Sequence, residues 1–187
     1  MKYFLSMLFA SFAMVPLVDV AKAADYQPAM PSETETFSGI YLRGDAGASF
    51  LNWSNAADNS TYVGDAGIGY RFDPNIRADL TYNWTGDYSI VPGATLKTNT
   101  VLGNIYYDWK NESAFVPYVG AGVGYGWQYG AGGQPNGEGI AVGLDAGIAY
   151  EMTNNLAVDV GYRFHDILDG GQNTPEHQVA AGLRVQF

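Results

Sequence analysis

Side chains alternate with a period of two in eight segments of the chain, and this pattern limits the possible folds more than any other feature. In each segment every second position is uncharged and mostly apolar, while the positions between them carry the charged residues. A period of two is that of a β-strand, whose successive side chains point to opposite faces of a sheet. The predicted strands are 38–51, 61–72, 76–86, 99–110, 115–128, 139–151, 156–166 and 177–187.

The connections between these segments are short and long in turn. Tight turns are expected at Asp73-Pro74-Asn75, at Asn111-Glu112-Ser113-Ala114 and at Thr153-Asn154-Asn155. The other connections are longer and centre on NAADN, SIVPGATLK, GAGGQPNG and LDGGQNTP. This order is typical of a meander, so the sequence predicts an all-β fold, an eight-stranded antiparallel up-and-down barrel.

The uncharged face distinguishes a membrane barrel from a water-soluble one. A soluble sheet would need a second layer to cover this face, and no remaining segment has the pattern of such a layer. A lipocalin-like carrier would point the face inward, which leaves the aromatic belts described below unexplained. A closed barrel in lipid satisfies its backbone hydrogen bonds and turns apolar positions outward. We therefore predict a transmembrane β-barrel.

The charged face is predicted to line the lumen of this barrel. Of the basic residues after residue 37, only Lys97 is off this face, and we expect it in a loop. Eight strands enclose an interior just wide enough for side chains. We interpret the charges as ion pairs that fill the lumen, with a pore for small solutes as the alternative. The predicted network comprises Arg43, Asp45, Asp65, Arg71, Arg77, Asp79, Asp108, Lys110, Asp145, Glu151, Asp159, Arg163 and Arg184.

Aromatic residues gather on the uncharged face at both ends of the predicted strands. Two such levels are typical of the two membrane–water interfaces of a barrel. The end with the long connections carries Phe50, Tyr62, Tyr82, Trp84, Tyr125, Trp127, Tyr162 and Phe164. The end with the short turns carries Tyr70, Phe72, Tyr107, Trp109, Tyr150 and Phe187.

The stretch YVGAGVGYGWQYG, residues 118–130, has glycine at every second position of the charged face, at Gly120, Gly122, Gly124 and Gly126. Two interpretations are open. The glycines leave room in a narrow lumen for larger side chains from other strands, or they permit the strand to coil.

The N-terminus has the layout of a secretory signal peptide, because Lys2 precedes an apolar run and Ala21 and Ala23 are small residues before the expected cleavage. We predict a signal peptide over 1–23, a polar N-terminal segment over 24–36 and the barrel over 37–187. The chain has no cysteine, which excludes disulfides and thiolate chemistry. Its formal net charge of −10 argues against nucleic acid as a partner.

Candidate chemistry is confined to the last hairpin and the rim beside it. The stretch from His165 to Asp169, with Glu176 and His177, would bind a divalent cation if the hairpin brought both histidines together. Lipid-modifying catalysis would need a nucleophile and a base within hydrogen-bond reach. The hydroxyl candidates are Ser49, Ser54, Ser60, Thr85 and Ser89, and no GxSxG spacing occurs. We expect no enzyme, no metal site and no cofactor.

With these features the sequence resembles the family of small eight-stranded bacterial outer-membrane proteins, which includes the OmpA-type membrane domain and the opacity-like, porin-family surface proteins. The motifs that carry the resemblance are GAGVGYGW, LAVDVGYRF and the final LRVQF, and it covers about residues 37–187. The resemblance implies a bacterial outer-membrane location and a last strand that the assembly machinery reads. That signal would comprise Val179, Ala181, Leu183, Val185 and Phe187.

The resemblance also implies a role. We expect a monomeric structural or surface-interaction protein with loops exposed to the outside. The expected partners are outer-membrane lipid, lipopolysaccharide, the outer-membrane assembly machinery and an extracellular ligand that the sequence does not identify. A small porin or a lipid-modifying outer-membrane enzyme is the alternative. No peptidoglycan-binding domain follows the barrel, so the wall-anchoring role of longer OmpA-type proteins is not expected.

Overall fold

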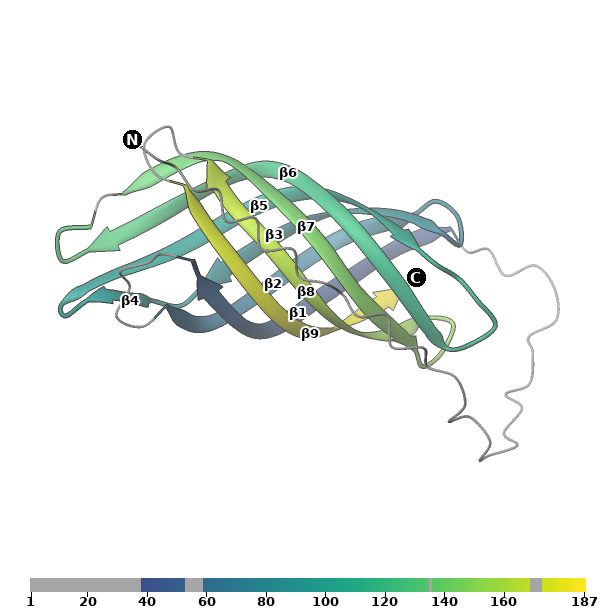
Figure 1. The fold of residues 1–187 in the computed structure, drawn as a ribbon. Helices are drawn as coiled ribbons and strands as arrows, with labels where there is room; N and C mark the ends of the chain where they lie inside the picture. Colours follow the sequence, from purple (N-terminus) through teal and green to yellow (C-terminus); the bar gives the residue numbers. More distant parts are fainter. Residues whose placement is uncertain (1–37, 53–58, 135, 169–172) are drawn as a thin grey trace, which may run out of the picture. The chain divides into compact units, whose positions relative to one another are not determined.

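The computed structural model describes residues 38–52, 59–134, 136–168 and 173–187, and these form nine β-strands in one antiparallel sheet (Figure 1). The strands are β1 (Gly39–Leu51), β2 (Ser60–Arg71), β3 (Ile76–Thr85), β4 (Tyr88–Val91), β5 (Ala94–Asp108), β6 (Phe115–Ala131), β7 (Gly137–Glu151), β8 (Leu156–Leu168) and β9 (Thr174–Gln186). Within these ranges no helix is long and apolar enough to cross a membrane. The predicted signal peptide (1–23) and polar segment (24–36) lie outside the described residues.

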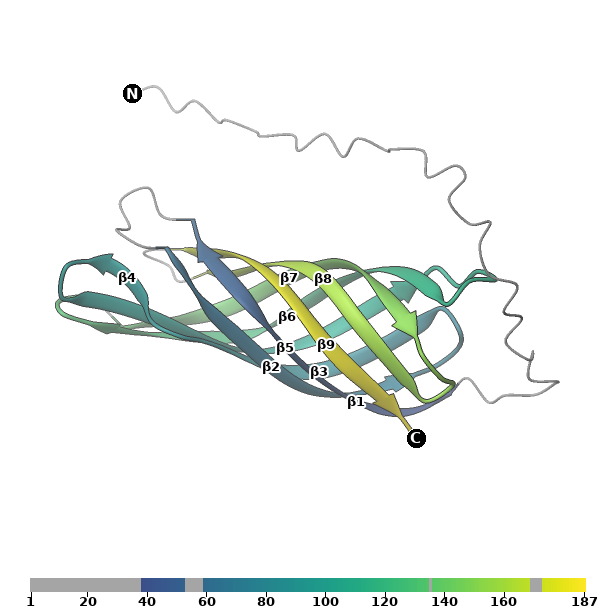
Figure 2. The ribbon, with the colours of Figure 1, turned by 90° about the horizontal axis from the view of Figure 1, so that it is seen from below.

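The sheet closes on itself. Its strand order is β3-β2-β1-β9-β8-β7-β6-β5-β4, and an additional pairing of β3 with β5 completes a ring of eight strands. The short β4 pairs only with the outer part of β5 and stands outside this ring. Strands that are neighbours in sequence are neighbours in the ring, and β9 returns to pair with β1 (Figure 2). The predicted eight-stranded antiparallel up-and-down barrel is confirmed.

The short turns lie where the sequence predicts them, and side chains hold each one. Asp73 Oδ1 accepts hydrogen bonds from the backbone N–H of Asn75 at 2.7 Å and of Ile76 at 3.0 Å. Asn111 Oδ1 accepts from the N–H of Ser113 at 2.7 Å, and Thr153 Oγ1 accepts from that of Leu156 at 3.1 Å. Asp, Asn and Thr favour turns because they bond to nearby backbone in this way.

The connection predicted around SIVPGATLK is different. Instead of a loop, the chain forms β4, turns at Pro92-Gly93 and continues directly into β5. Gly93 has a φ of 83°, which glycine adopts at no steric cost. The prediction of Lys97 in a loop is therefore wrong, because Lys97 lies in β5 with its side chain exposed.

Most strands extend further toward the long connections than the alternation predicts. Strand β5 begins at Ala94, β6 ends at Ala131, and β8 continues to Leu168. Two hairpins, β4–β5 and β6–β7, consequently project at that end of the barrel (Figure 1).

The two sets of alternate positions face opposite sides of the sheet. On β7, for example, Leu144 is 59% exposed on the outside, whereas Asp145 is buried in the lumen. The core of the molecule is therefore the lumen, and it consists mainly of polar and charged side chains.

The regularly spaced glycines of β6 face this lumen beneath larger side chains from other strands. A Cβ on Gly120 would overlap the ring of Tyr106, and one on Gly122 would overlap the Asn104 amide. A Cβ on Gly126 would come within 2.7 Å of Ile167. These contacts support the interpretation that the glycines leave room, while at Gly124 the backbone carbonyl of Val101 takes the space.

Candidate functional site

Every predicted network residue takes part in at least one ion pair. We call the buried members the charged network, and each of their side chains is at most 7% exposed. The charged network comprises Arg43, Asp45, Asp65, Arg71, Arg77, Asp79, Asp108, Asp145, Asp159, Arg163 and Arg184. Burial of charge at this density is tolerated only where each group has partners.

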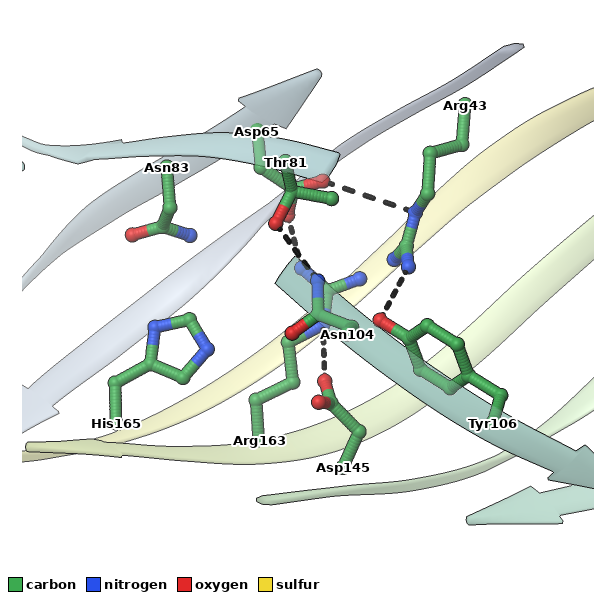
Figure 3. Close-up of a pocket in the computed structure, with 9 residues that line it drawn as sticks. All are labelled: Arg43, Asp65, Thr81, Asn83, Asn104, Tyr106, Asp145, Arg163 and His165. Atoms are coloured by element: carbon green, nitrogen blue, oxygen red, sulfur yellow. Dashed lines mark hydrogen bonds and ion pairs between the residues drawn. The ribbon is translucent and has the colours of Figure 1, made fainter. Parts of the chain in front are cut away.

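Two arginines organise the middle of the lumen (Figure 3). Arg43 contacts Asp45 at 2.8 Å and Asp79 at 3.4 Å, and it donates a 2.9 Å hydrogen bond to the Tyr106 hydroxyl. Arg163 contacts Asp45 at 3.1 Å. It also pairs with Asp65, and with Asp145 at 3.3 Å. The arginines come from β1 and β8 and the carboxylates from β1, β2, β3 and β7, so the network ties strands together across the barrel.

The space left between these side chains is small. The cavity lined by Arg43, Asp65, Asp145, Arg163 and His165 has a volume of about 10 Å³ (Figure 3). A cavity of that size is at the lower limit for a single water molecule. This cavity therefore has no room for a hydrated ion.

Arg77 occupies the lumen nearer the short turns. Its Nε donates to Asp108 at 3.1 Å, and its guanidinium lies 3.9 Å from the centroid of the Tyr106 ring. Arg71 contacts Asp108 at 3.0 Å. Tyr118 flanks Arg77 from another strand, with its ring centroid 5.1 Å from the guanidinium. A buried guanidinium stacked on aromatic rings gains a cation–π contribution in addition to its ion pair.

Lys110 and Glu151 form a separate ion pair at the short-turn rim, with side chains 22% and 32% exposed. Partial burial lowers the pKa of the Lys110 ammonium, and its hydrogen bond to Glu151 opposes that shift. This rim pair is more open to water than the charged network.

Toward the long connections, a layer without cations replaces the charged network. Glu176 is buried on β9, where it accepts hydrogen bonds from Thr98 Oγ1 at 2.6 Å and from Gln178 Nε2 at 3.1 Å. Asn83 donates to Gln178 Oε1 at 3.3 Å. In the part of the chain that the structure describes, Glu176 has no ion pair.

A hydrophobic cluster lies next to this layer, at the long-connection end of the strands. We call it the apolar cap: Leu51 of β1, Tyr88 and Ile90 of β4, and Leu96 of β5, all buried. Leu51 is the cross-strand partner of Glu176, so the cap directly adjoins the uncharged layer. The Tyr88 hydroxyl donates a 2.7 Å hydrogen bond to Ser49 Oγ, which ties β4 to β1.

The last hairpin does not bring the two histidines together. His165 is buried in the lumen, where it faces Glu176, while His177 lies on the outer face and contacts Tyr162 through a 2.5 Å hydrogen bond at Nδ1. The residues with resolved placement contain no group of three or more His, Cys, Asp or Glu side chains that could hold a metal. The two-histidine arrangement considered from the sequence is therefore wrong, and Asp169 lies outside the described residues.

The remaining predicted sites lie on the outer face. The aromatic residues at both predicted levels point outward, and most are more than a third exposed. Several strands continue beyond the aromatic level at the long-connection end. Four aromatic residues of that level therefore lie within strands rather than at strand ends: Tyr125, Trp127, Tyr162 and Phe164. The predicted assembly signal forms one outward row on β9, with Val179, Ala181, Leu183 and Val185 exposed and Phe187 following the strand.

Several lumen residues were missed from the sequence. Four of them lie at the same alternate positions of their strands as the charged residues, which we call the same parity, and contact those residues: Tyr41, Tyr106, Tyr118 and Asn104. The Tyr41 hydroxyl, for example, donates a 2.9 Å hydrogen bond to Asp79. Glu176 also has this parity, since it lies two positions before Gln178 on β9. Extending the alternation to uncharged polar and aromatic residues would have found the tyrosines and Asn104, and an earlier start of the last strand would have found Glu176.

Comparison with known proteins places this architecture in a family. Residues 10–187 match the family described as "Outer membrane protein beta-barrel domain". The outer membrane protein PagN of Salmonella typhimurium is 27% identical, over 67% of this chain and 73% of PagN.

Two solved structures share the fold. Neisserial surface protein A (NspA) superposes with a TM-score of 0.68 at 24% identity, over 80% of this chain and 98% of NspA. Ail, the attachment invasion locus protein of Yersinia pestis, superposes with a TM-score of 0.55 at 14% identity, over 80% of this chain and 97% of Ail. The chain therefore belongs to the outer membrane protein β-barrel domain family and is a protein of the bacterial outer membrane.

Proposed function

We propose that this chain is a surface-interaction protein whose barrel is a closed scaffold that presents its long-connection end to the outside of the cell. The observation that carries the proposal is the set of large and charged side chains that occupy the lumen. The charged network occupies the middle and the short-turn half, and the apolar cap occupies the long-connection end. If these side chains leave no passage through the barrel, the parts left to act are the outer face and the long connections.

A porin is the less favoured function. A channel needs a continuous polar path, and here the cavity among the central side chains has a volume of about 10 Å³. Acids and bases are paired along the lumen, so its field offers little selectivity for one sign of ion.

Catalysis is also less favoured. Neither histidine is hydrogen-bonded to a serine or threonine in the described part of the chain, and His165 is buried away from lipid. A nucleophile activated by a histidine requires such contact. The relatives of this chain include a "Putative adhesin" of Rickettsia bellii, 32% identical over 45% of this chain, which supports a surface role without identifying the ligand.

The ligand seen with one structural neighbour does not transfer to this chain. Ail has been solved with the heparin analogue sucrose octasulfate. A highly sulfated ligand requires clustered cations. On the outward face of the described strands Lys97 is the single Lys or Arg, because the arginines line the lumen. The proposed partners of the outer face are outer-membrane lipid and lipopolysaccharide, and that of the β9 row is the assembly machinery.

The surface role can be tested on whole cells. Cells that display the full chain are compared with cells in which 53–58 and 169–172 are replaced by Gly/Ser sequences of the same length. Attachment to an epithelial cell layer is expected to exceed that of vector-only cells and to fall after replacement. Electrophoresis of heated and unheated samples checks that the barrel still folds. Attachment no greater than that of vector-only cells, or unchanged by the replacement, would contradict the proposal.

A further inference from the structure

The outer face of β6 and β7 carries a hollow that the closed-scaffold role does not use. It lies at the long-connection end, has a volume of about 600 Å³, and is lined by Tyr125, Trp127, Tyr129, Asn136 and Glu138, among others. This volume is within the range of small-molecule binding sites. These residues come from the end of β6, the start of β7 and the position just before β7, so the hollow lies on one pair of neighbouring strands.

The aromatic wall of the hollow is partly fixed in place. Trp127 stacks on Tyr82 of β3, with ring centroids 6.3 Å apart and an angle of 29° between the ring planes. Tyr82 in turn donates a 2.9 Å hydrogen bond to Asn99 of β5. Tyr125 and Tyr129 flank Trp127 on the same face and are 46% and 49% exposed. The three aromatic side chains therefore form a row, and the central ring, that of Trp127, is held in place by its stacking on Tyr82.

The polar wall lies beside this row. Glu138 is the cross-strand partner of Trp127 and is exposed. It has neither an ion pair nor a hydrogen bond among the residues that the structure places. Asn136 accepts a 2.9 Å hydrogen bond from the backbone N–H of Gly130 through its Oδ1, which orients its side-chain NH₂ as a donor. One unused carboxylate and one oriented amide thus stand next to ordered rings.

An aromatic girdle in lipid does not by itself require this arrangement. Girdle aromatics sit at the headgroup level, but Tyr129 lies two residues further toward the connection than Trp127. A carboxylate on the outward face is also a poor neighbour for lipid tails or anionic headgroups. The combination of rings, carboxylate and amide is better suited to a ligand with an apolar face and a polar edge.

We propose that this hollow is a binding site for a neutral saccharide. A pyranose ring has a face of C–H groups, which pack on aromatic rings, and an edge of hydroxyls. Those hydroxyls donate to a carboxylate such as Glu138 and accept from an amide such as Asn136. The Glu138 charge disfavours phosphorylated, sulfated or acidic sugars, so the partner is an uncharged glycan outside the cell rather than the anionic saccharide of lipopolysaccharide.

This inference rests on the proposed surface role and gives it a ligand class. The direct test uses the full chain in phospholipid nanodiscs that contain no lipopolysaccharide. Maltohexaose and cellohexaose serve as neutral probes, and a heparin-derived hexasaccharide serves as the anionic probe. Binding is measured by calorimetry and by saturation-transfer NMR. At least one neutral hexasaccharide is expected to bind, and the heparin fragment is not.

Variants locate the site. Tyr129→Ala and Glu138→Ala are each expected to weaken binding of the neutral probe at least tenfold. Trp109→Ala, which removes an exposed aromatic at the opposite end of the barrel, is the matched control and should leave binding unchanged. Lys97→Gln removes the cation beside Tyr129 and should also have no effect, whereas an anionic ligand would depend on it.

The inference is overturned if neither neutral probe binds, if only the heparin fragment binds, or if Tyr129→Ala and Trp109→Ala weaken binding equally. These outcomes are separable from the whole-cell test, because the variants leave 53–58 and 169–172 intact. Cells that attach through those connections while the purified chain binds no neutral probe would refute the saccharide site alone. Cells that do not attach would refute the surface role.

Discussion

The two ends of the lumen are occupied by different kinds of side chain. Toward the short turns, arginines and aspartates interlock, as in the contacts of Arg77 with Asp108 and the Tyr106 ring. At the other end, the apolar cap of Leu51, Tyr88, Ile90 and Leu96 packs beside a hydrogen-bonded layer without cations. Removal of one member of a buried ion pair leaves a buried charge without its partner. Truncation of a side chain in an apolar cluster instead loses packing contacts and leaves a cavity. The stability of the barrel is thus expected to respond differently to substitution at each end.

The largest effect is expected in the charged network. Arg77→Ala should lower the free energy of unfolding by about 3–5 kcal/mol, because Asp108 loses a partner in a buried site. Urea titration of the folded protein, followed by the mobility difference between heated and unheated samples, measures the change. Lys110→Ala at the partly exposed rim pair is the control, with an expected loss of about 0–1 kcal/mol. Equal losses in the two variants would show that the network is not tightly coupled.

The assignment of faces gives the next largest effect. Leu144→Arg places a charge on the outer face midway between Glu138 and Tyr150 of β7, at a cost of about 2–4 kcal/mol in the bilayer. Gly143→Ser is the adjacent lumen-facing change, and its Cβ would lie 3.1 Å from Leu102 and 3.3 Å from His165. Folding yield into lipid vesicles should fall much more for the first variant. A greater loss for Gly143→Ser would contradict the face assignment.

The apolar cap should yield a smaller effect. Leu96→Ala removes a fully buried side chain but leaves the cavity close to the barrel mouth, so we expect about 2 kcal/mol, the low end for such truncations. The same urea titration applies. Leu168→Ala, an exposed residue at the same end, is the matched control. A loss as large as that of Arg77→Ala would remove the distinction between the two ends.

The smallest effect concerns the bond that ties the cap to β1. Tyr88→Phe deletes the hydroxyl that donates to Ser49 and should cost about 1 kcal/mol. Ser49→Ala should cost a similar amount, and the double variant should cost less than the sum of the two, because both changes break one bond. Strict additivity would indicate that the two groups do not interact.

Much of the fold could be predicted because the strand period is two and the lumen is polar. Parity alone assigns Arg43, Asp145 and Arg184 to the same side of the sheet, whatever their cross-barrel contacts are. Which acid meets which base could not be predicted, because contacts such as that of Arg163 with Asp65 depend on the stagger of the closed barrel.

The apolar cap was missed for a specific reason. Leu96 is an apolar residue that faces the lumen, whereas the alternation predicts polar residues there. In addition, Pro92-Gly93 made the stretch that contains β4 and the start of β5 resemble a loop. The two-histidine arrangement was left open as an alternative, although the alternation of faces along the strands was sufficient to exclude it. His165 shares the parity of Arg163, whereas His177 shares that of Val179, which faces outward.

Conductance of the unmodified chain in a planar lipid bilayer tests the closed lumen most directly. With the charged network and the apolar cap in place, the protein should insert and give no steady conductance steps. The double variant Arg77→Ala/Leu96→Ala removes one large side chain from the charged network and one from the apolar cap. It should give brief conductance openings if the barrel still inserts. Large and stable steps from the unmodified protein would contradict the closed scaffold and identify the chain as a porin.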